Sequence, residues 1–176
     1  MNMIPSDIDI GENMRNSIDN LIRLIGGQSA IDICDRLIIP SNELPVNENN
    51  EIILFKKCSI DKKIGYSKKI GYAIVKLRVP ITKDTEIVMM RNSSVGYANK
   101  MRVSSAIVDS IYGIDSRTET IKKSTITQVR SLHDSSFLYV LGKTVSPKNK
   151  FDSSVTLQCS SGIYGFLNVI SAINYV

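Results

Sequence analysis

The chain has 176 residues and a net charge of +5, with 22 Lys and Arg side chains against 17 Asp and Glu side chains. A hydrophobic content of 43% and only 10 Gly and 5 Pro exclude disordered, collagen-like and low-complexity proteins. A chain of this length can bury a core of its own, so we expect one compact unit, preceded by a short N-terminal region.

Two short helices are predicted before residue 40. Between residues 12 and 25, apolar side chains recur at the spacing of one helical face: Met14, Ile18, Leu21, Ile22 and Ile25. Gly26 and Gly27 end this helix, and a second one begins at Ser29 and stops at Pro40. The polar residues that follow are typical of a linker. We therefore divide the chain into a helical, acidic N-terminal region with its linker, residues 1–50, and a basic β-rich domain, residues 51–176.

Beyond residue 50 the sequence consists of short segments rich in Ile, Val, Thr and Tyr, separated by clusters of small polar residues. This pattern predicts strands joined by turns, at residues 52–55, 72–79, 86–90, 106–112, 120–129, 137–141 and 155–159. Residues 163–173 fit either a strand or a buried helix, because periodicity does not separate the two in a short apolar segment. The predicted fold class is α+β, with N-terminal helices followed by a mainly antiparallel β-sheet or sandwich.

Charge is divided unevenly along the chain. Residues 1–55 carry three basic and nine acidic side chains, a net charge of −6, whereas residues 56–176 carry 19 basic and eight acidic ones, a net charge of +11. Such a basic body attracts phosphate-rich partners, either RNA and nucleoprotein or an anionic membrane surface. The acidic front can also dock on the basic body of another copy, so we expect a homo-oligomer.

A six-residue repeat lies in the most basic segment. KKIGYS at residues 62–67 is followed at once by KKIGYA, and residues 56–78 hold eight basic side chains against one acidic one. Lysines can contact phosphates while interleaved tyrosines stack on bases, which predicts an anion-binding surface for nucleic acid or a membrane. Lysines that protect an edge strand from aggregation are the alternative. The predicted binding residues are Lys56, Lys57, Lys62, Lys63, Tyr66, Lys68, Lys69, Tyr72, Lys76 and Arg78.

The sequence contains no pattern of catalytic or metal-ligating residues. Cys34, Cys58 and Cys159 are widely separated, so we expect buried thiols, with no metal site and no disulfide framework. His133 lies in SLHDSS, which we interpret as a polar turn and not as a catalytic triad, whose members come from separate elements. Glycine-rich phosphate loops do not occur. We therefore expect a protein that is not an enzyme, with no cofactor and no small-molecule substrate.

Two segments resemble the matrix proteins of rhabdoviruses, of the plant-infecting, cytorhabdovirus-like type. Residues 66–83, YSKKIGYAIVKLRVPITK, resemble the basic alternating strand that opens that family's sheet, and residues 160–176, SSGIYGFLNVISAINYV, resemble its apolar closing segment. The resemblance implies a non-enzymatic viral structural protein that self-associates and bridges ribonucleoprotein and membrane. It also implies a location in the host cytoplasm and the virion, peripheral to the membrane, which agrees with the lack of a predicted signal peptide or membrane span.

Two other viral families are open alternatives. Residues 70–95, IGYAIVKLRVPITKDTEIVMMRNSSV, are similar to the strand-turn-strand centre of plant-virus movement proteins of the thirty-kilodalton group. The number of predicted strands also suffices for a jelly-roll coat protein. The sequence leaves the choice among matrix, movement and coat roles open.

Overall fold

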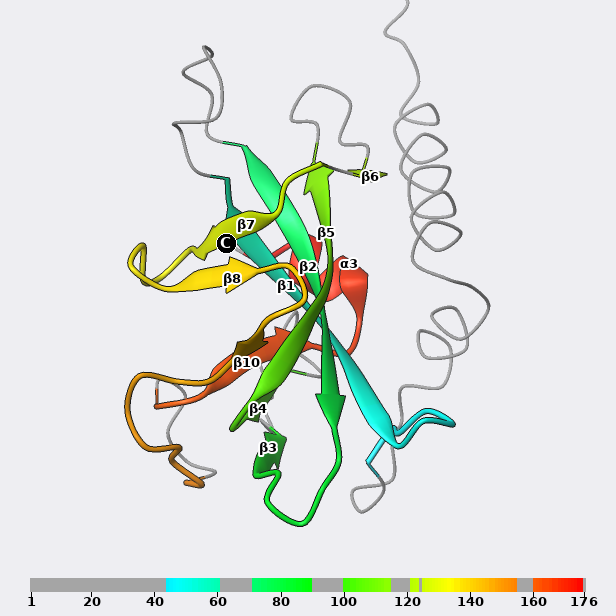
Figure 1. Ribbon diagram of the computed structural model, residues 1–176, viewed down its shortest axis with the longest axis vertical. Coiled ribbons are helices and arrows are strands. Elements are labelled where there is room, and N and C mark those ends of the chain that lie inside the picture. The colour runs from blue at the N-terminus through cyan, green and yellow to red at the C-terminus, as the bar shows by residue number, and fades with distance from the viewer. Residues whose placement is uncertain are drawn as a thin grey trace, which may run out of the picture.

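A computed structural model describes residues 44–60, 71–89, 100–114, 121–123, 125–154 and 160–175. These residues form a 10-stranded sheet and one short helix (Figure 1). The strands are β1 (Glu51–Ser59), β2 (Tyr72–Pro80), β3 (Ile87–Met89), β4 (Lys100–Val103), β5 (Ala106–Ile114), β6 (Ile121–Lys123), β7 (Gln128–Ser131), β8 (Leu138–Val140), β9 (Thr144–Val145) and β10 (Ile163–Phe166), and the helix is α3 (Val169–Ile173).

Three long antiparallel strands, β1, β2 and β5, form the centre of the sheet. Successive side chains of a strand point to opposite faces, so the alternation of apolar residues in β1 and β2 gives the sheet two buried faces. One face forms the larger core, whose members include Ile52, Leu54, Val75, Leu77, Val108 and Tyr139. The other face packs against α3 in a smaller core, formed by Phe55, Ile74, Tyr112, Ile121, Phe166, Val169 and Ala172.

The sheet curls around the larger core. Both β10 and β7 pair with the edge of β1 that faces away from β2, β10 at Phe55 and β7 at Cys58 and Ser59. At the other side of the centre, β9 pairs with β5 at Ala106 and Ile107. The chain from β7 through β8 to β9 therefore crosses from β1 to β5 and covers the larger core (Figure 1).

The predicted α+β class is wrong, because the described residues are almost entirely antiparallel sheet with one short helix, close to the C-terminal end of the chain. The prediction rested on helical spacing in two short segments before residue 40, whereas the described buried residues alternate along strands. The two helices predicted before residue 40 lie outside the described residues. The β-rich nature of the domain after residue 50 is confirmed for its described part.

Most of the predicted strands are present with altered ends, and two strands were missed. The segment predicted at 120–129 forms β6 and β7, and residues 163–173 contain both alternatives, first β10 and then α3. The Asn168 side chain caps α3 by accepting a hydrogen bond of 2.7 Å from the Ile170 amide. Two cations in KMRV concealed β4, and β9 is only two residues long. The strand predicted at 155–159 lies outside the described residues.

Cys58 is a buried free thiol, as predicted. Burial raises the pKa of this thiol to about 12, so it is protonated at neutral pH. Cys34 and Cys159 lie outside the described residues. In the described part of the chain, no helix has the length and apolar character needed to cross a membrane.

Candidate functional site

A cavity of about 470 Å³ lies where β7 and β10 diverge from the edge of β1. Its walls carry basic and aromatic side chains from six segments of the chain. The basic side chains are Lys56, Lys57, Lys100, His133 and Lys148, and the aromatic ones are Phe137, Tyr139, Tyr164, Phe166 and Tyr175. A volume of this size is within the range of about 300–1,000 Å³ that is usual for small-ligand sites.

The edge of β1 pairs with β10 at one point and with β7 further along the strand, and we call the gap between these two pairings the fork of β1. Two consecutive lysines at this fork line the same cavity. Lys56 and Lys57 lie between the residues of β1 that pair with β10 and those that pair with β7, and their side chains point to opposite faces. The Lys56 ammonium lies 5.8 Å from the centroid of the Tyr139 ring. The Lys57 ammonium lies 4.8 Å from the centroid of the Tyr72 ring and donates a hydrogen bond of 3.0 Å to the Tyr175 carbonyl.

Lys100 supplies a third ammonium group from the start of β4. Its Nζ lies 5.1 Å from the centroid of the Tyr164 ring and 4.9 Å from that of Tyr175. An aromatic face attracts a cation without cancelling its charge, so the rings hold the ammonium in place and leave it free to bind an anion. Among the residues that the structure describes, no carboxylate lies within ion-pair distance of Lys56, Lys57 or Lys100.

Burial and the neighbouring positive charges lower the pKa values of two cavity residues, Lys56 and His133. Burial lowers the pKa of the Lys56 amine below its ordinary value of 10.5, and the charge of Lys100 lowers it further. Burial also lowers the pKa of His133 below 6.5, and the charges of Lys56 and Lys100 act in the same direction. His133 is therefore neutral at neutral pH, and the charge of the cavity comes from its lysines.

The predicted polar turn at residues 131–136 is present between β7 and β8, but His133 also forms part of the cavity wall. Its Nε2 lies 3.0 Å from the Tyr175 hydroxyl, and the two rings meet edge to face at 5.5 Å. Asp134 pairs instead with Lys148, at 2.7 Å, and this hydrogen bond is the main cause that lowers the pKa of Asp134 to about 2. Among the described residues, the only carboxylate in the lining is thus matched by the fourth lysine.

The sequence-predicted binding residues are divided between two places. Lys56 and Lys57 line the cavity at the fork of β1, and Tyr72 contacts the Lys57 ammonium but does not line the cavity. Lys76 and Arg78 point to the face of β2 that carries α3, and they do not line the cavity. The remaining members of the predicted surface, Lys62, Lys63, Tyr66, Lys68 and Lys69, lie outside the described residues.

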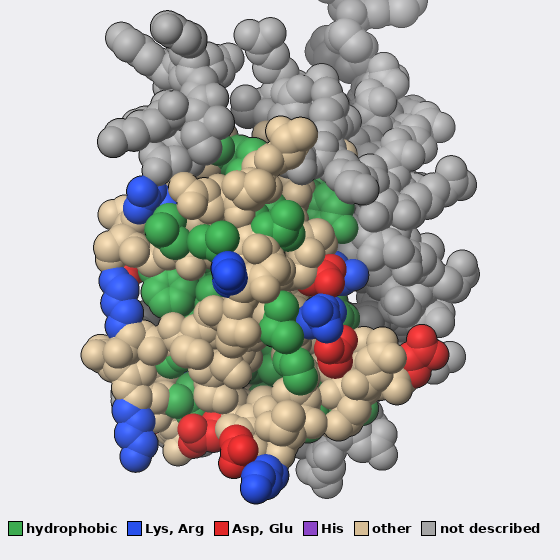
Figure 2. All heavy atoms as spheres, viewed as in Figure 1, with side chains coloured by type: hydrophobic (Ala, Val, Ile, Leu, Met, Phe, Trp, Pro, Cys, Tyr) green, Lys and Arg blue, Asp and Glu red, His purple; other side chains and the backbone are tan. Residues whose placement is uncertain are grey.

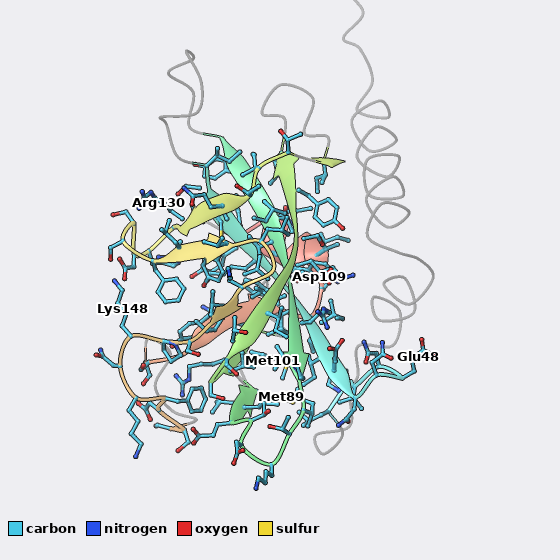
Figure 3. All side chains as sticks on the ribbon, in the orientation of Figure 1. Glu48, Met89, Met101, Asp109, Arg130 and Lys148 are labelled. Carbon is cyan, nitrogen blue, oxygen red and sulfur yellow. The ribbon has the colours of Figure 1, made fainter. Side chains whose placement is uncertain are left out.

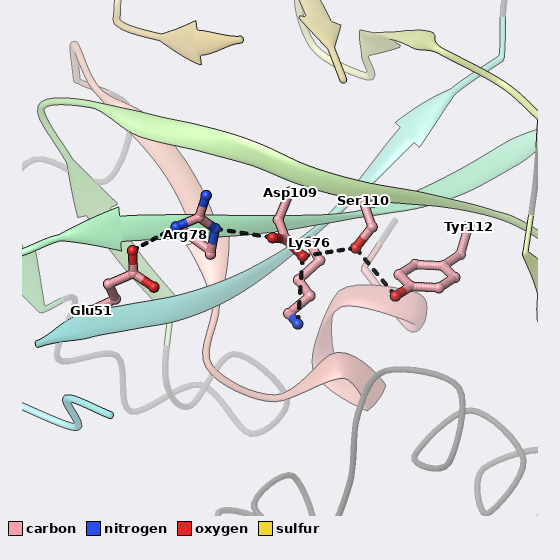
Figure 4. A network of polar contacts seen from close by, with 6 residues as sticks. All are labelled: Glu51, Lys76, Arg78, Asp109, Ser110 and Tyr112. Carbon is pink, nitrogen blue, oxygen red and sulfur yellow. Dashed lines mark hydrogen bonds and ion pairs between the residues drawn. The ribbon is translucent and has the colours of Figure 1, made fainter. Parts of the chain in front are cut away.

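Lys76 and Arg78 belong to a network in which carboxylates match their charges (Figure 4). Arg78 donates hydrogen bonds of 2.7 Å to Glu51 and 2.9 Å to Asp109, and the Lys76 ammonium lies 3.5 Å from Asp109. Asp109 reaches both cations because β5 contains a bulge there: Lys76 pairs with Ser110, and the next residue of β2 pairs with Val108. This network stabilises the sheet face and leaves little net charge for a partner.

Sequence reasoning missed Lys100, Lys148, His133 and the aromatic wall, because these residues are scattered along the chain. Figure 2 shows Lys and Arg side chains spread singly over one face of the described domain, with no continuous basic patch there. Figure 3 shows Arg130 and Lys148 on the side of the β7–β8 hairpin and Glu48 on the opposite side. The cavity is therefore a more concentrated positive site than the surface in this view.

A family model described only as a family of unknown function, DUF5758, matches residues 42–172. The matched range contains every cavity residue named above except Tyr175. No curated protein and no solved structure matches the chain. In the described ranges, no group of three His, Cys, Asp or Glu side chains is placed to hold a metal ion.

Proposed function

The chain belongs to the DUF5758 family, and we propose that its β-rich domain is a non-enzymatic binding domain that takes a phosphate group of its partner into the cavity. One observation carries this proposal. Lys56, Lys57 and Lys100 all line one cavity, and no described carboxylate lies within ion-pair distance of their ammonium groups.

The chemistry of the walls favours phosphate as the bound group. Each lysine ammonium is a compact cation with three donors, which suits the several acceptor oxygens of a phosphate. Hydrogen bonds between charged partners are stronger than neutral ones, and a largely apolar lining reduces dielectric screening. Burial is the main cause that lowers the pKa of Lys56, and a phosphate in this position would offset the smaller contribution of the Lys100 charge.

The proposal is compatible with the partners expected from the sequence, which are RNA or nucleoprotein, an anionic membrane surface and a second copy of the chain. The division of charge into −6 and +11 supports self-association. The matrix-like role, the location at the membrane and the virion, and the movement and coat alternatives rest on resemblance and stay predictions.

A pair of Lys→Gln substitutions tests the proposed function. We expect Lys100→Gln to weaken binding of pyrophosphate, measured by calorimetry at low ionic strength, by about tenfold, or about 1.4 kcal/mol, because one unneutralised ammonium is removed. Lys76→Gln is the matched control, because its charge is already paired with Asp109 outside the cavity. Equal losses in the two variants, or no binding by the wild-type protein, would contradict the proposal.

A further inference from the structure

The cavity has two chemically different parts. The cationic part is lined by Lys56 and Lys57 at the fork of β1 and by Lys100 at the start of β4. The aromatic part carries Phe137 and Tyr139 from the β7–β8 hairpin, whose rings lie 5.2 Å apart at an angle of 53°. The two parts adjoin, because the Lys56 ammonium lies 5.8 Å from the centroid of the Tyr139 ring. Most of the surface that lines the cavity is apolar, although most of its charged side chains are basic. An inorganic phosphate would use only the cationic part.

The cavity lining also contains uncharged polar residues. Ser131, Asn149 and Ser161 line the cavity, and the Ser161 hydroxyl donates a hydrogen bond of 2.9 Å to the Asn149 carbonyl, which fixes this wall. Hydroxyl and amide groups both donate and accept hydrogen bonds, as the edges of nucleobases and ribose hydroxyls require. A ligand that fills the cavity therefore has a planar apolar body, polar edges and an anionic group.

We infer that the cavity binds a nucleotide, with the base against the partly exposed ring of Phe137 and the phosphate beside the lysines of the lining. This inference rests on the proposed phosphate-binding function and names its ligand. Stacking on aromatic side chains together with phosphate contacts is the general mode by which proteins hold single nucleotides of a strand. The same chemistry is offered by a free mononucleotide and by one nucleotide of single-stranded RNA.

Calorimetry on the full chain with four probes tests the inference. The probes are adenosine 5′-monophosphate, ribose 5-phosphate, adenosine and a short single-stranded RNA. We expect the mononucleotide to bind at least tenfold more tightly than ribose 5-phosphate and adenosine, because only the mononucleotide occupies both parts of the cavity. RNA that binds more tightly than the mononucleotide identifies a strand as the source, and RNA that binds no more tightly identifies the free nucleotide.

A matched pair of Phe→Leu substitutions tests the position of the base. Phe137→Leu keeps an apolar side chain but removes the ring, so we expect it to reduce the preference for the mononucleotide over ribose 5-phosphate by about fivefold or more. Phe151→Leu is the control, because the Phe151 ring packs on Arg102 and does not line the cavity. Thermal unfolding of both variants establishes that each is folded at the temperature of the titration.

The possible failures are distinguishable. Equal affinities for the mononucleotide and ribose 5-phosphate would overturn the nucleotide inference and leave phosphate binding intact. Failure of every phosphate-bearing probe to bind would overturn both. Binding to vesicles that contain phosphatidylserine, abolished in Lys100→Gln and without any binding of nucleotide or RNA, would assign the cavity to a lipid headgroup and overturn the nucleotide inference.

Discussion

His133 is the residue of the cavity whose ordinary pKa, 6.5, lies nearest to neutral pH. It faces the Tyr175 hydroxyl on one side, and the charges of Lys56 and Lys100 reach it from the other elements of the wall. Burial and these two charges lower its pKa below the ordinary value of 6.5, so protonation of His133 opposes folding of the empty domain. A bound anion acts in the opposite sense, because it stabilises the imidazolium.

Acidification is therefore expected to strengthen anion binding while it destabilises the empty protein. As the pH falls from 7 through 6.5 and below the lowered pKa, His133 gains a charge that attracts an anion, whereas the charge of a phosphodiester is constant over this range. Titration of single-stranded RNA against the protein at several pH values measures the effect. The control is His133→Asn, which keeps a polar side chain near Tyr175 but does not titrate. Parallel pH profiles for the two proteins would contradict the prediction.

At the scale of single elements, close packing between β4 and β10 fixes one wall of the cavity. Arg102 of β4 is fully buried and donates hydrogen bonds of 2.7 Å to the Asp152 carbonyl and 2.5 Å to the Ser154 carbonyl. Its guanidinium also lies 5.8 Å from the centroid of the Tyr164 ring. Arg102 thus joins the segment after residue 150 to the sheet, next to Lys100 in the same strand.

Gly162 is required for this packing, and Gly162→Ala is expected to destabilise the domain. An added Cβ would overlap Arg102 Cγ and lie 2.7 Å from its Cδ, and the hydrogen bonds of the guanidinium oppose any movement of Arg102. Overpacking of this kind costs about 1–3 kcal/mol, which urea unfolding measures. Gly71→Ala is the control, because its Cβ would be 3.1 Å from the flexible end of Ile60. Equal stabilities for the two variants would contradict this account.

The strands were predictable from the sequence where apolar residues alternate, as in β1, β2 and β5. The prediction failed at β4, which contains the buried charged residue Arg102. Arg102 is buried because it donates hydrogen bonds to backbone carbonyls that are distant in sequence, and no local sequence pattern predicts these contacts. The division of residues 163–173 into a strand and a helix depends on Asn168, whose capping role is a polar signal within an otherwise apolar segment.

At the scale of the whole molecule, the prediction of a basic binding region included two residues that line the cavity but did not predict the cavity. Lys56 and Lys57 belong to the dense basic run, so local counting found them. Lys100, His133 and Tyr175 line the same cavity only because the fold brings together β4, the β7–β8 hairpin and the segment after α3, which are far apart in the sequence. The density of basic residues along the sequence does not distinguish the lysines of the cavity from Lys76 and Arg78, because the carboxylates that pair with these two residues lie on other strands.

The lysine repeat offers a further test at this scale, because its charges and those of the cavity are expected to act on one RNA strand. Replacing Lys62, Lys63, Lys68 and Lys69 by Ala is expected to weaken RNA binding and to flatten its salt dependence. For a single strand, each phosphate that the protein no longer neutralises lowers the slope of log affinity against log salt by about 0.7. Binding to anionic vesicles is expected to fall in parallel, by about 1 kcal/mol for each lysine that lies near the lipid.

Titrations of RNA at several salt concentrations, on the wild type, the quadruple Ala variant and Lys100→Gln, separate the two groups of lysines. If the repeat binds the strand, the salt slope falls further in the quadruple variant than in Lys100→Gln, because the quadruple variant neutralises fewer phosphates. Circular dichroism and thermal unfolding report whether the fold is kept. A folded quadruple variant that binds RNA and vesicles like the wild type, but aggregates more readily, would instead assign the repeat to protection of a strand edge, because charged side chains at an edge oppose pairing between copies.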